Sequence, residues 1–400
     1  MFTFLEWLMV DMRNVLLLLV LFFETLAAEV AYLPLTEQGF PYPLNTSLGV
    51  YDLDAGLRLK KIEIGHGVGP VFLNDSQDTV YVAARYENKI LAIDTTTLTP
   101  IKTWQNLPTN PDQIFLSQDN SKLFFINLNV GTGQNSLYQI DLMTDVVNEV
   151  LFFPGFSIEP VVYSQNLQYM ALYLYDYFNN ERRLVTYQTN DMILVHDTPL
   201  NEGDYLVMID NEGEGFFYKD VTNAEFVSKK LSDATENWRF SFPGETSFSQ
   251  PLELVDGFLT IRGINNHYQV NKQTGQGSPI ARPANEEPVR FFGSIDLNNG
   301  GQLIAIDYPI VICVTGLCSL SGRLNIHQVD VFNNNTQLIY QSSETLGSNP
   351  VGRFIGQRFF RGSAGQPVPL FEHFGLIALL MVLMVFVSYK RFLYDPKSSH

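Results

Sequence analysis

Histidine and carboxylate side chains are the first residues to consider for chemistry, because close groups of them hold metals or move protons. The six histidines are His66, His196, His267, His327, His373 and His400. No two of them have the spacing of a metal-binding motif such as His-Glu-x-x-His. We therefore predict no metal site. His66, in the glycine-rich stretch from Gly65 to Gly69, is the single candidate ligand.

Other chemical signatures are equally sparse. The acidic, glycine-rich run from Asp210 to Gly215 lacks the twelve-position spacing of a calcium loop, and we interpret it as a solvated turn. No Gly-x-Ser-x-Gly nucleophile motif occurs. We predict no catalytic and no cofactor-binding residue. We expect no cofactor. The alternative is a bound Ca²⁺ or another divalent ion.

Cys313 and Cys318 are the two cysteines, and Thr315-Gly316 between them is typical of a hairpin turn. Cysteines that face each other across a hairpin satisfy disulfide geometry. In an exported domain we expect them to form a disulfide that staples the hairpin, worth about 2 kcal/mol on the chain-entropy model. A zinc site needs more ligands than this pair offers.

Any functional site in this chain must be positioned by short β-strands, which the sequence predicts in a repeating pattern. One repeated element is an alternating strand that ends in an acid or amide before a turn, with copies ending at Asp52, Asp94, Asp141, Gln188, Asn271 and Asp330. A degenerate copy is expected near Phe217-Tyr218. A second element, two strands joined by a polar turn, precedes several copies, as at Phe72 to Ala83 and Phe115 to Ile126.

The repeat interval of about 42 to 47 residues, with about four strands per unit, is typical of a β-propeller blade. Complete units begin near residues 67, 110, 157, 203, 246 and 287. Residues 48–64 supply the last two strands of a unit, and residues 348–362 supply its first one or two. We therefore expect an all-β, seven-bladed propeller over residues 45–362, closed by both termini. A solenoid and an open double sandwich are the alternatives.

The repeats resemble a known group. The pattern Phe-Leu-Ser-x-Asp, then an apolar strand, then Ile-Asp-x-x-Thr is similar to the YVTN-type propeller repeats of exported bacterial and archaeal proteins, best over residues 48–200. The resemblance implies a fold and no particular activity, because such propellers serve many functions.

The C-terminal forty residues predict where the protein is located. Residues 374–389 carry no charge, and with the four preceding residues they reach the length of a membrane-spanning helix. Lys390 and Arg391 begin the tail 390–400, which the positive-inside rule places in the cytoplasm. We expect a single-pass protein whose remaining chain lies outside the membrane.

The segment before this helix resembles a sorting signal. Val368 to Gly375 aligns with the start of IPTL-CTERM signals, relatives of PEP-CTERM, with Pro369 and Gly375 identical and Phe374 in place of the usual tryptophan. Residues 363–373 are then a linker and sorting motif. The resemblance implies the envelope of a Gram-negative bacterium and processing by an exosortase-like peptidase. An ordinary type I anchor is the alternative.

The N-terminus is typical of a secretory signal. Arg13 precedes the apolar run Val15 to Phe23, and small residues follow, so residues 1–28 are expected to be a signal peptide cleaved after Ala27 or Ala28. Acidic residues before Met12 suggest that Met12 is the true start. An uncleaved signal anchor is the alternative.

Composition limits the function classes. The formal charge of −17 argues against nucleic-acid binding, which needs a basic surface. We expect a membrane-anchored or surface-sorted binding module whose partner is a protein or glycan of the envelope or matrix. One alternative is a lactonase-like hydrolase with a divalent ion at the propeller axis, for which His66 is best placed. The other is a eukaryotic receptor-like ectodomain, in which sequons at Asn45, Asn74 and Asn334 would matter.

Overall fold

The computed structural model of the protein divides into two units, Met1–Phe359 and Phe360–His400. All described residues belong to the first unit. They are 27–36, 45–127, 134–164, 166–176, 178–201, 203–210, 215–220, 222–242, 252–253, 257–262, 267–280, 292–297, 303–307, 310–314, 317–321, 324–330, 335–342, 345–346 and 355–359. The expected membrane helix 374–389 and tail 390–400 therefore lie outside the described residues, as does most of the expected signal peptide.

Within the described part, the fold is built from strands with one short 3₁₀ helix, η1 (Arg85–Glu87). No helix there is long and apolar enough to span a membrane. Leu, Ile, Val, Phe and Tyr are the common apolar residues of the strands, and the β-branched and aromatic ones among them favour the pleated, half-buried surface of a sheet.

Five consecutive sheets each contain four antiparallel strands in chain order. Their strands are β4 (Val68–Leu73), β5 (Thr79–Ala84), β6 (Lys89–Asp94) and β7 (Thr99–Trp104); β8 (Gln113–Leu116), β9 (Lys122–Ile126), β10 (Gln134–Asp141) and β11 (Val147–Pro154); β12 (Ser157–Tyr163), β13 (Tyr169–Asp176), β14 (Glu181–Gln188) and β15 (Leu194–Leu200); β16 (Asp204–Ile209), β17 (Gly215–Asp220), β18 (Glu225–Lys230) and β19 (Glu236–Ser241); β20 (Leu252–Glu253), β21 (Phe258–Arg262), β22 (His267–Asn271) and β23 (Gly277–Ile280).

A sixth sheet is interrupted by an inserted hairpin. It has the order β24-β25-β28-β29, and the hairpin of β26 and β27 lies between its second and third strands. The strands are β24 (Phe292–Leu297), β25 (Leu303–Asp307), β26 (Ile310–Val314), β27 (Leu317–Ser321), β28 (Leu324–Asp330) and β29 (Asn335–Ser342).

The seventh sheet, here called the closing sheet, joins the two ends of the unit. Its strands are β1 (Ala27–Thr36), β2 (Asn45–Asp52), β3 (Leu57–His66), β30 (Thr345–Leu346) and β31 (Ile355–Phe359), and both β30 and β31 pair with β1. The expected join between the ends is therefore present. However, the strands of this fold begin at Ala27 and not at the expected residue 45, because β1 supplies the second strand of the closing sheet.

Burial on both faces explains why the sequence pattern did not predict strand β1. Tyr32 and Leu33 are both fully buried, so β1 has apolar side chains on both faces and no polar alternation. A strand of this kind cannot be distinguished by periodicity from the apolar signal segment that precedes it.

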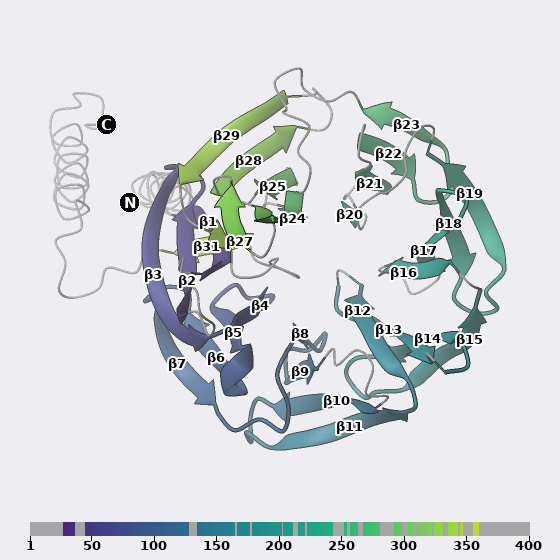
Figure 1. The fold of residues 1–400 in the computed structure, drawn as a ribbon, viewed down its shortest axis with the longest axis horizontal. Helices are drawn as coiled ribbons and strands as arrows, with labels where there is room; N and C mark the ends of the chain where they lie inside the picture. Colours follow the sequence, from purple (N-terminus) through teal and green to yellow (C-terminus); the bar gives the residue numbers. More distant parts are fainter. Residues whose placement is uncertain are drawn as a thin grey trace, which may run out of the picture. The chain divides into compact units, whose positions relative to one another are not determined.

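The sheets follow one another around a ring (Figure 1). The first three strands of a sheet are buried on both faces, as β4 is along its whole length, whereas the fourth strand, such as β7, is mostly exposed. Apolar clusters fill the space between consecutive sheets. One of them joins the closing sheet to β4–β7, and another joins β12–β15 to β16–β19. The core is therefore distributed around the ring, between sheets.

The repeated acid or amide marks the end of the third strand. Asp94, Asp141 and Asn271 each end a third strand and accept backbone N–H bonds from the turn that follows. The degenerate copy was misplaced, because Phe217-Tyr218 lies in the second strand, β17. The third strand there is β18, which ends at Lys230, and Asp233 caps its turn by accepting a bond from Thr235 N (2.9 Å).

Candidate functional site

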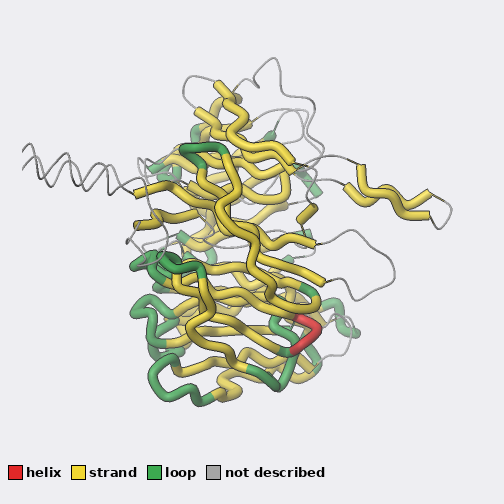
Figure 2. The backbone as a smooth tube through the Cα atoms, turned by 90° about the vertical axis from the view of Figure 1, so that its left-hand side faces the viewer, coloured by secondary structure: helices red, strands yellow, loops and turns green. Residues whose placement is uncertain are grey.

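The ring has two chemically different ends. Antiparallel strands place the loop from the second to the third strand at the same end as the loop to the next sheet. Bonds from Arg85 N to Gly67 O (2.8 Å) and from Leu107 N to Asn88 O (3.0 Å) join such loops. We call this end the crossover face; η1 lies on it (Figure 2). The opposite end, which carries the other two turns of each sheet, is the turn face.

Turns of the turn face are tied to one another by repeated backbone bonds. Within four sheets, the turn after the third strand donates to the turn after the first, as from Thr95 N to Asp78 O (2.9 Å). Between sheets, Thr189 Oγ1 accepts from Gln118 N and Asn190 Oδ1 accepts from Asp119 N, both at 3.1 Å. The polar groups of these turns are largely used in holding the ring together.

The crossover face carries exposed aromatic side chains. Among the described residues, the exposed phenylalanines and tyrosines are Tyr86 (57%), Phe152 (50%), Phe178 (89%) and Tyr205 (43%). Phe152 lies on the outer strand β11, and the other three lie on crossover connections or at the crossover end of a strand. Aromatic side chains are enriched in protein interfaces, where they bury a large area at low entropic cost.

Phe178 is held in a fixed turn. The hairpin of β13 and β14 is closed by Asp176, whose carboxylate accepts from Phe178 N (2.8 Å) and Asn179 N (3.1 Å). Asn179 Nδ2 adds a third bond at 2.7 Å, and these bonds lower the pKa of Asp176. Asn180 Oδ1 accepts from the Tyr175 hydroxyl (3.0 Å). The aromatic tip is therefore presented by a turn whose described residues are hydrogen-bonded to Asp176 and Tyr175.

Arg182 lies beside this tip on the crossover end of β14. It is directly opposite Tyr175 in the ladder, and its guanidinium carbon lies 4.7 Å from the centre of the Tyr175 ring. Tyr173, two residues from Tyr175, stacks on Tyr205 of the next sheet at 5.7 Å between ring centres. Three tyrosine rings and the Arg182 guanidinium therefore lie near the junction between the β12–β15 and β16–β19 sheets.

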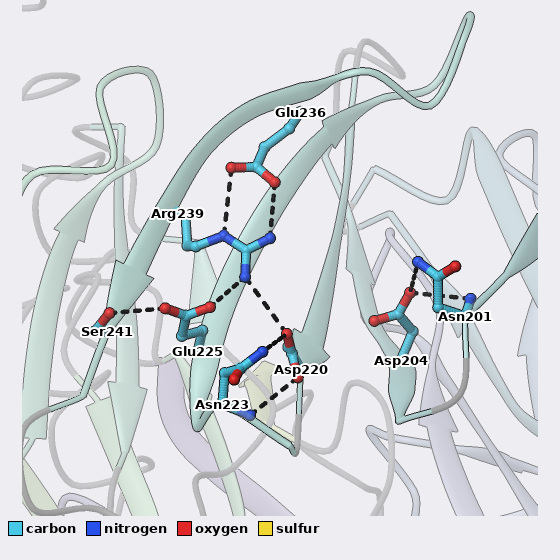
Figure 3. A network of polar contacts seen from close by, with 8 residues as sticks. All are labelled: Asn201, Asp204, Asp220, Asn223, Glu225, Glu236, Arg239 and Ser241. Atoms are coloured by element: carbon cyan, nitrogen blue, oxygen red, sulfur yellow. Dashed lines mark hydrogen bonds and ion pairs between the residues drawn. The ribbon is translucent and has the colours of Figure 1, made fainter.

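A polar network runs along the outer strand β19 from the crossover end of the β16–β19 sheet (Figure 3). Arg239 binds Glu225, Glu236 (2.9 Å) and Asp220 (3.4 Å). Its bonds lower the pKa of Glu236, and these carboxylates raise the pKa of Arg239. The guanidinium occupies the position between three carboxylates that a cation would take, so the network is satisfied internally.

Asp204 lies apart from Arg239 in the same view. Its side chain is 4% exposed and accepts bonds from the main-chain and side-chain nitrogens of Asn201, at 3.1 and 3.3 Å. Burial, with a smaller contribution from the Asp220 carboxylate opposite it, raises its pKa. Burial, and the nearby Asp204, likewise raise the pKa of Tyr218 to about 12.

His66 is the last residue of β3 and lies at the junction with the next sheet. Its backbone N–H donates to Glu87 Oε1 (2.7 Å), and Lys89 also binds Glu87. Although partial burial opposes it, these bonds lower the pKa of Glu87. His66 Nδ1 is buried without a partner among the described residues.

Within the ranges that the structure describes, no three His, Cys, Asp or Glu side chains lie close enough together to hold a metal ion. The expectation for His66 as a ligand therefore gains no partner residues from the described part of the chain. Cys313 and Cys318 are direct Cα partners across β26 and β27, as the hairpin prediction required. The sorting-motif residues Pro369, Phe374, Gly375, Lys390 and Arg391 lie outside the described residues.

Sequence reasoning missed Phe178, Arg182 and Tyr205. A signal was present in the run from Tyr175 to Asn180, where aromatic residues continue into the asparagines of a turn. An aromatic side chain in a turn has no core to enter, so this run predicts an exposed ring.

Solved structures share this architecture. A putative 6-phosphogluconolactonase from Bacteroides fragilis superposes with a TM-score of 0.54 at 11% identity, over 82% of this chain and 98% of that one. A second, from Bacteroides uniformis, gives 0.53 at 11% identity over 82% and 99%. A functionally unknown protein from Desulfotomaculum acetoxidans gives 0.53 at 10% identity over 83% and 100%. The fold is a β-propeller.

At such low identity the likeness shows the fold alone. No protein-family model matches the sequence, and no curated protein matches it. The propeller sheets are called blades below. What the chain does must be argued from its own two faces.

Proposed function

We propose that the chain is an exported, seven-bladed β-propeller that binds a protein or glycan of the envelope or matrix through its crossover face. Its YVTN-like repeats supply a rigid disc, and its C-terminal helix attaches that disc to the membrane. It acts as a binding module and not as an enzyme.

The observation that carries this proposal is the difference between the two faces. The turn face uses its polar groups in latches between turns, as at Thr189 and Asn190. The crossover face presents Tyr86, Phe178 and Tyr205 to solvent. Functional residues of rigid scaffolds concentrate on loops, and among the described residues three of the four exposed phenylalanine and tyrosine side chains lie on the crossover face.

Two features support seven blades and closure. The described strands form seven sheets of four or five strands besides the β26–β27 hairpin. One of these sheets takes strands from both ends of the unit, which removes the two exposed sheet edges that an open array would leave.

The two ends of the propeller lie together in the closing sheet. Ala27 and Phe359 are paired, and Leu53 of the adjacent turn bonds to Glu29 O (2.8 Å). The proposed signal peptide, residues 1–28, includes the first two residues of β1, so its removal leaves the three pairs from Glu29↔Gln357 to Ala31↔Ile355 to join β1 and β31. In this proposal the membrane helix, residues 374–389, is either released by an exosortase-like peptidase at the sorting motif or remains as an anchor.

The lactonase-like hydrolase is the alternative to this proposal. It needs a cation held by several side chains at the axis, and within the described residues no three His, Cys, Asp or Glu side chains lie close enough to hold one. The likeness to putative lactonases concerns the fold.

The test compares partner recovery by two matched triple variants of the full-length chain, purified from the cells that produce it. Tyr86→Ser, Phe178→Ser and Tyr205→Ser remove the crossover aromatics, whereas Met143→Ser, Val146→Ser and Ile193→Ser remove exposed apolar side chains of the turn face. We expect a stoichiometric co-purifying partner to be lost only from the first variant. Loss from the turn-face variant alone, or equal recovery from both, would overturn the proposal.

A further inference from the structure

The described arginines divide into paired and unpaired side chains. Arg85, Arg183 and Arg239 each bind at least one carboxylate. Arg182 is half-buried, and among the described residues its guanidinium contacts only the Tyr175 ring. The chain has 42 acidic and 25 basic residues, so carboxylates are the most abundant partners for an arginine. Arg182 nevertheless has no carboxylate partner among the described residues.

The geometry leaves the donors of Arg182 available. The contact with the ring face is a cation–π contact and uses no N–H group as a hydrogen-bond donor, so these donors have no acceptor among the described residues. The Tyr175 hydroxyl donates to Asn180 Oδ1. The planar fork of guanidinium donors matches a carboxylate, which it can bind through two parallel hydrogen bonds.

Apolar surface lies next to this fork. Phe178 is 89% exposed, three residues from Tyr175 in the same hairpin, and Tyr205 is 43% exposed beside Tyr173. Phe, Tyr and Arg are the side chains that most often anchor protein interfaces. The hairpin therefore combines one cationic fork with apolar rings.

The remaining polar groups of the hairpin distinguish a peptide from a sugar. Asn179 Nδ2 is bonded to Asp176, and Asn180 Oδ1 is bonded to Tyr175. Each amide thus uses one of its two polar atoms within the turn, which reduces the number of groups left to recognise the many hydroxyls of a glycan. A ligand with one carboxylate and adjoining apolar side chains fits what is offered.

We propose that the β13–β14 hairpin docks an acidic peptide segment of a partner protein, with an Asp or Glu carboxylate on Arg182 and a neighbouring apolar side chain on Phe178. This inference rests on the proposed function and names the partner chemistry of one part of the crossover face.

The probe is a phage-displayed library of random dodecapeptides, selected on the purified full-length chain. The enriched sequences are made as synthetic peptides and their affinities measured. We expect a shared Asp or Glu beside an apolar residue. Arg182→Gln should weaken binding by roughly tenfold or more, and Phe178→Ala should weaken it as well. Replacing the peptide acid by its amide should cause a similar loss on the wild type and little further loss on Arg182→Gln.

Arg183→Gln is the matched control, because Arg183 is the next residue and already binds Asp197 (2.5 Å). Its affinity should stay within about twofold of the wild type. Arg182→Lys keeps the charge without the planar fork and should retain only part of the affinity. Thermal unfolding of each variant shows whether the fold is retained.

Several results would overturn the inference: no enriched peptide, enriched peptides without an acid, or equal losses from Arg182→Gln and Arg183→Gln. Binding of a tetragalacturonate probe through Arg182 in place of any peptide would also overturn it. If the crossover triple variant loses its partner while Arg182→Gln retains it, the proposed function stands and this inference fails.

Discussion

Ala27 and Phe359 lie directly opposite each other in the antiparallel pair of β1 and β31. The two ends of the propeller are therefore hydrogen-bonded neighbours in one sheet. Five residue pairs join β31 to β1, from Ala27↔Phe359 to Ala31↔Ile355. This short ladder closes the ring.

Removal of β31 should open the ring. A variant ending at residue 354 leaves residues 27–31 of β1 unpaired on that edge, while Leu35 and Thr36 still pair with β30, and we expect it to lose on the order of 3–5 kcal/mol of unfolding free energy. A variant ending at residue 362 keeps β31 and lacks the same C-terminal helix, so it is the control. Urea unfolding and limited proteolysis measure the difference. Equal stability of the two variants would contradict closure by this ladder.

Gly275 should be intolerant of any side chain. Its φ is +67°, and a Cβ there would lie 2.6 Å from Cδ2 of the buried Trp238, whose Nε1 donates to Lys272 O (2.8 Å). We expect Gly275→Ala to cost about 2–4 kcal/mol, from backbone strain and overpacking together. Gly155 has φ +84° with open space around it, so Gly155→Ala should cost only about 1 kcal/mol. Thermal unfolding of both variants decides whether the contact with Trp238 matters.

Arg239 should stabilise its blade through charge. Arg239→Ala leaves Asp220, Glu225 and Glu236 without their shared cation, and we expect a loss of about 1–2 kcal/mol at neutral pH, since the side chain is partly exposed. Because Arg239 lowers the pKa of Glu236, the stabilisation is present above the ordinary glutamate pKa and is lost as pH falls through the lowered value. Urea unfolding between pH 7 and pH 3 should show the difference from the wild type shrinking. Arg183→Ala, which breaks an exposed pair, should cost about 0–1 kcal/mol.

Ionised Asp204 should destabilise the fold at neutral pH, in contrast to the carboxylates bound by Arg239. Its pKa is raised in the folded protein, so the folded state binds the proton first, and this group adds stability as pH falls from the raised value towards the ordinary one. Asp204→Asn retains an oxygen acceptor for Asn201 and removes the charge facing Asp220. We expect a gain of about 0.2–1 kcal/mol at neutral pH that disappears on acidification. A loss of stability at neutral pH would show that the ionised form is needed.

The cysteine pair should be oxidised in the exported protein. Cys313 and Cys318 are cross-strand partners, and we expect alkylation without reduction to leave both unmodified, in a peptide about 2 Da lighter than its dithiol. Reduction should cost about 2 kcal/mol or less, because the loop is short. Full alkylation of the unreduced protein would disprove the disulfide.

The sequence was most informative where structure is set locally. The ends of third strands at Asp94 and Asp141 were predictable, because an alternating strand and an Asx turn are both encoded within a few residues. The cysteine hairpin was predictable for the same reason. β1 was not, because its partners in β2 are 10 to 22 residues away, its partners in β31 are about 320 to 330 residues away, and both of its faces are buried.

The candidate site was largely beyond prediction from one sequence. Arg182 and Arg183 are adjacent and identical in type, yet one stacks on Tyr175 and the other binds Asp197. Their difference arises from which face of β14 each occupies, and that depends on the register of three strands. Tyr205 meets Tyr173 only because consecutive blades pack together.

The most direct test of the crossover face as the binding face is site-specific photo-crosslinking in cells that produce the full-length chain. p-Benzoylphenylalanine is placed at Phe178 on the crossover face or at Met143 on the turn face, two side chains that are both 89% exposed. The account predicts a discrete crosslinked partner from position 178 and none from position 143. A partner captured from position 143 alone, or equally from both positions, would contradict it.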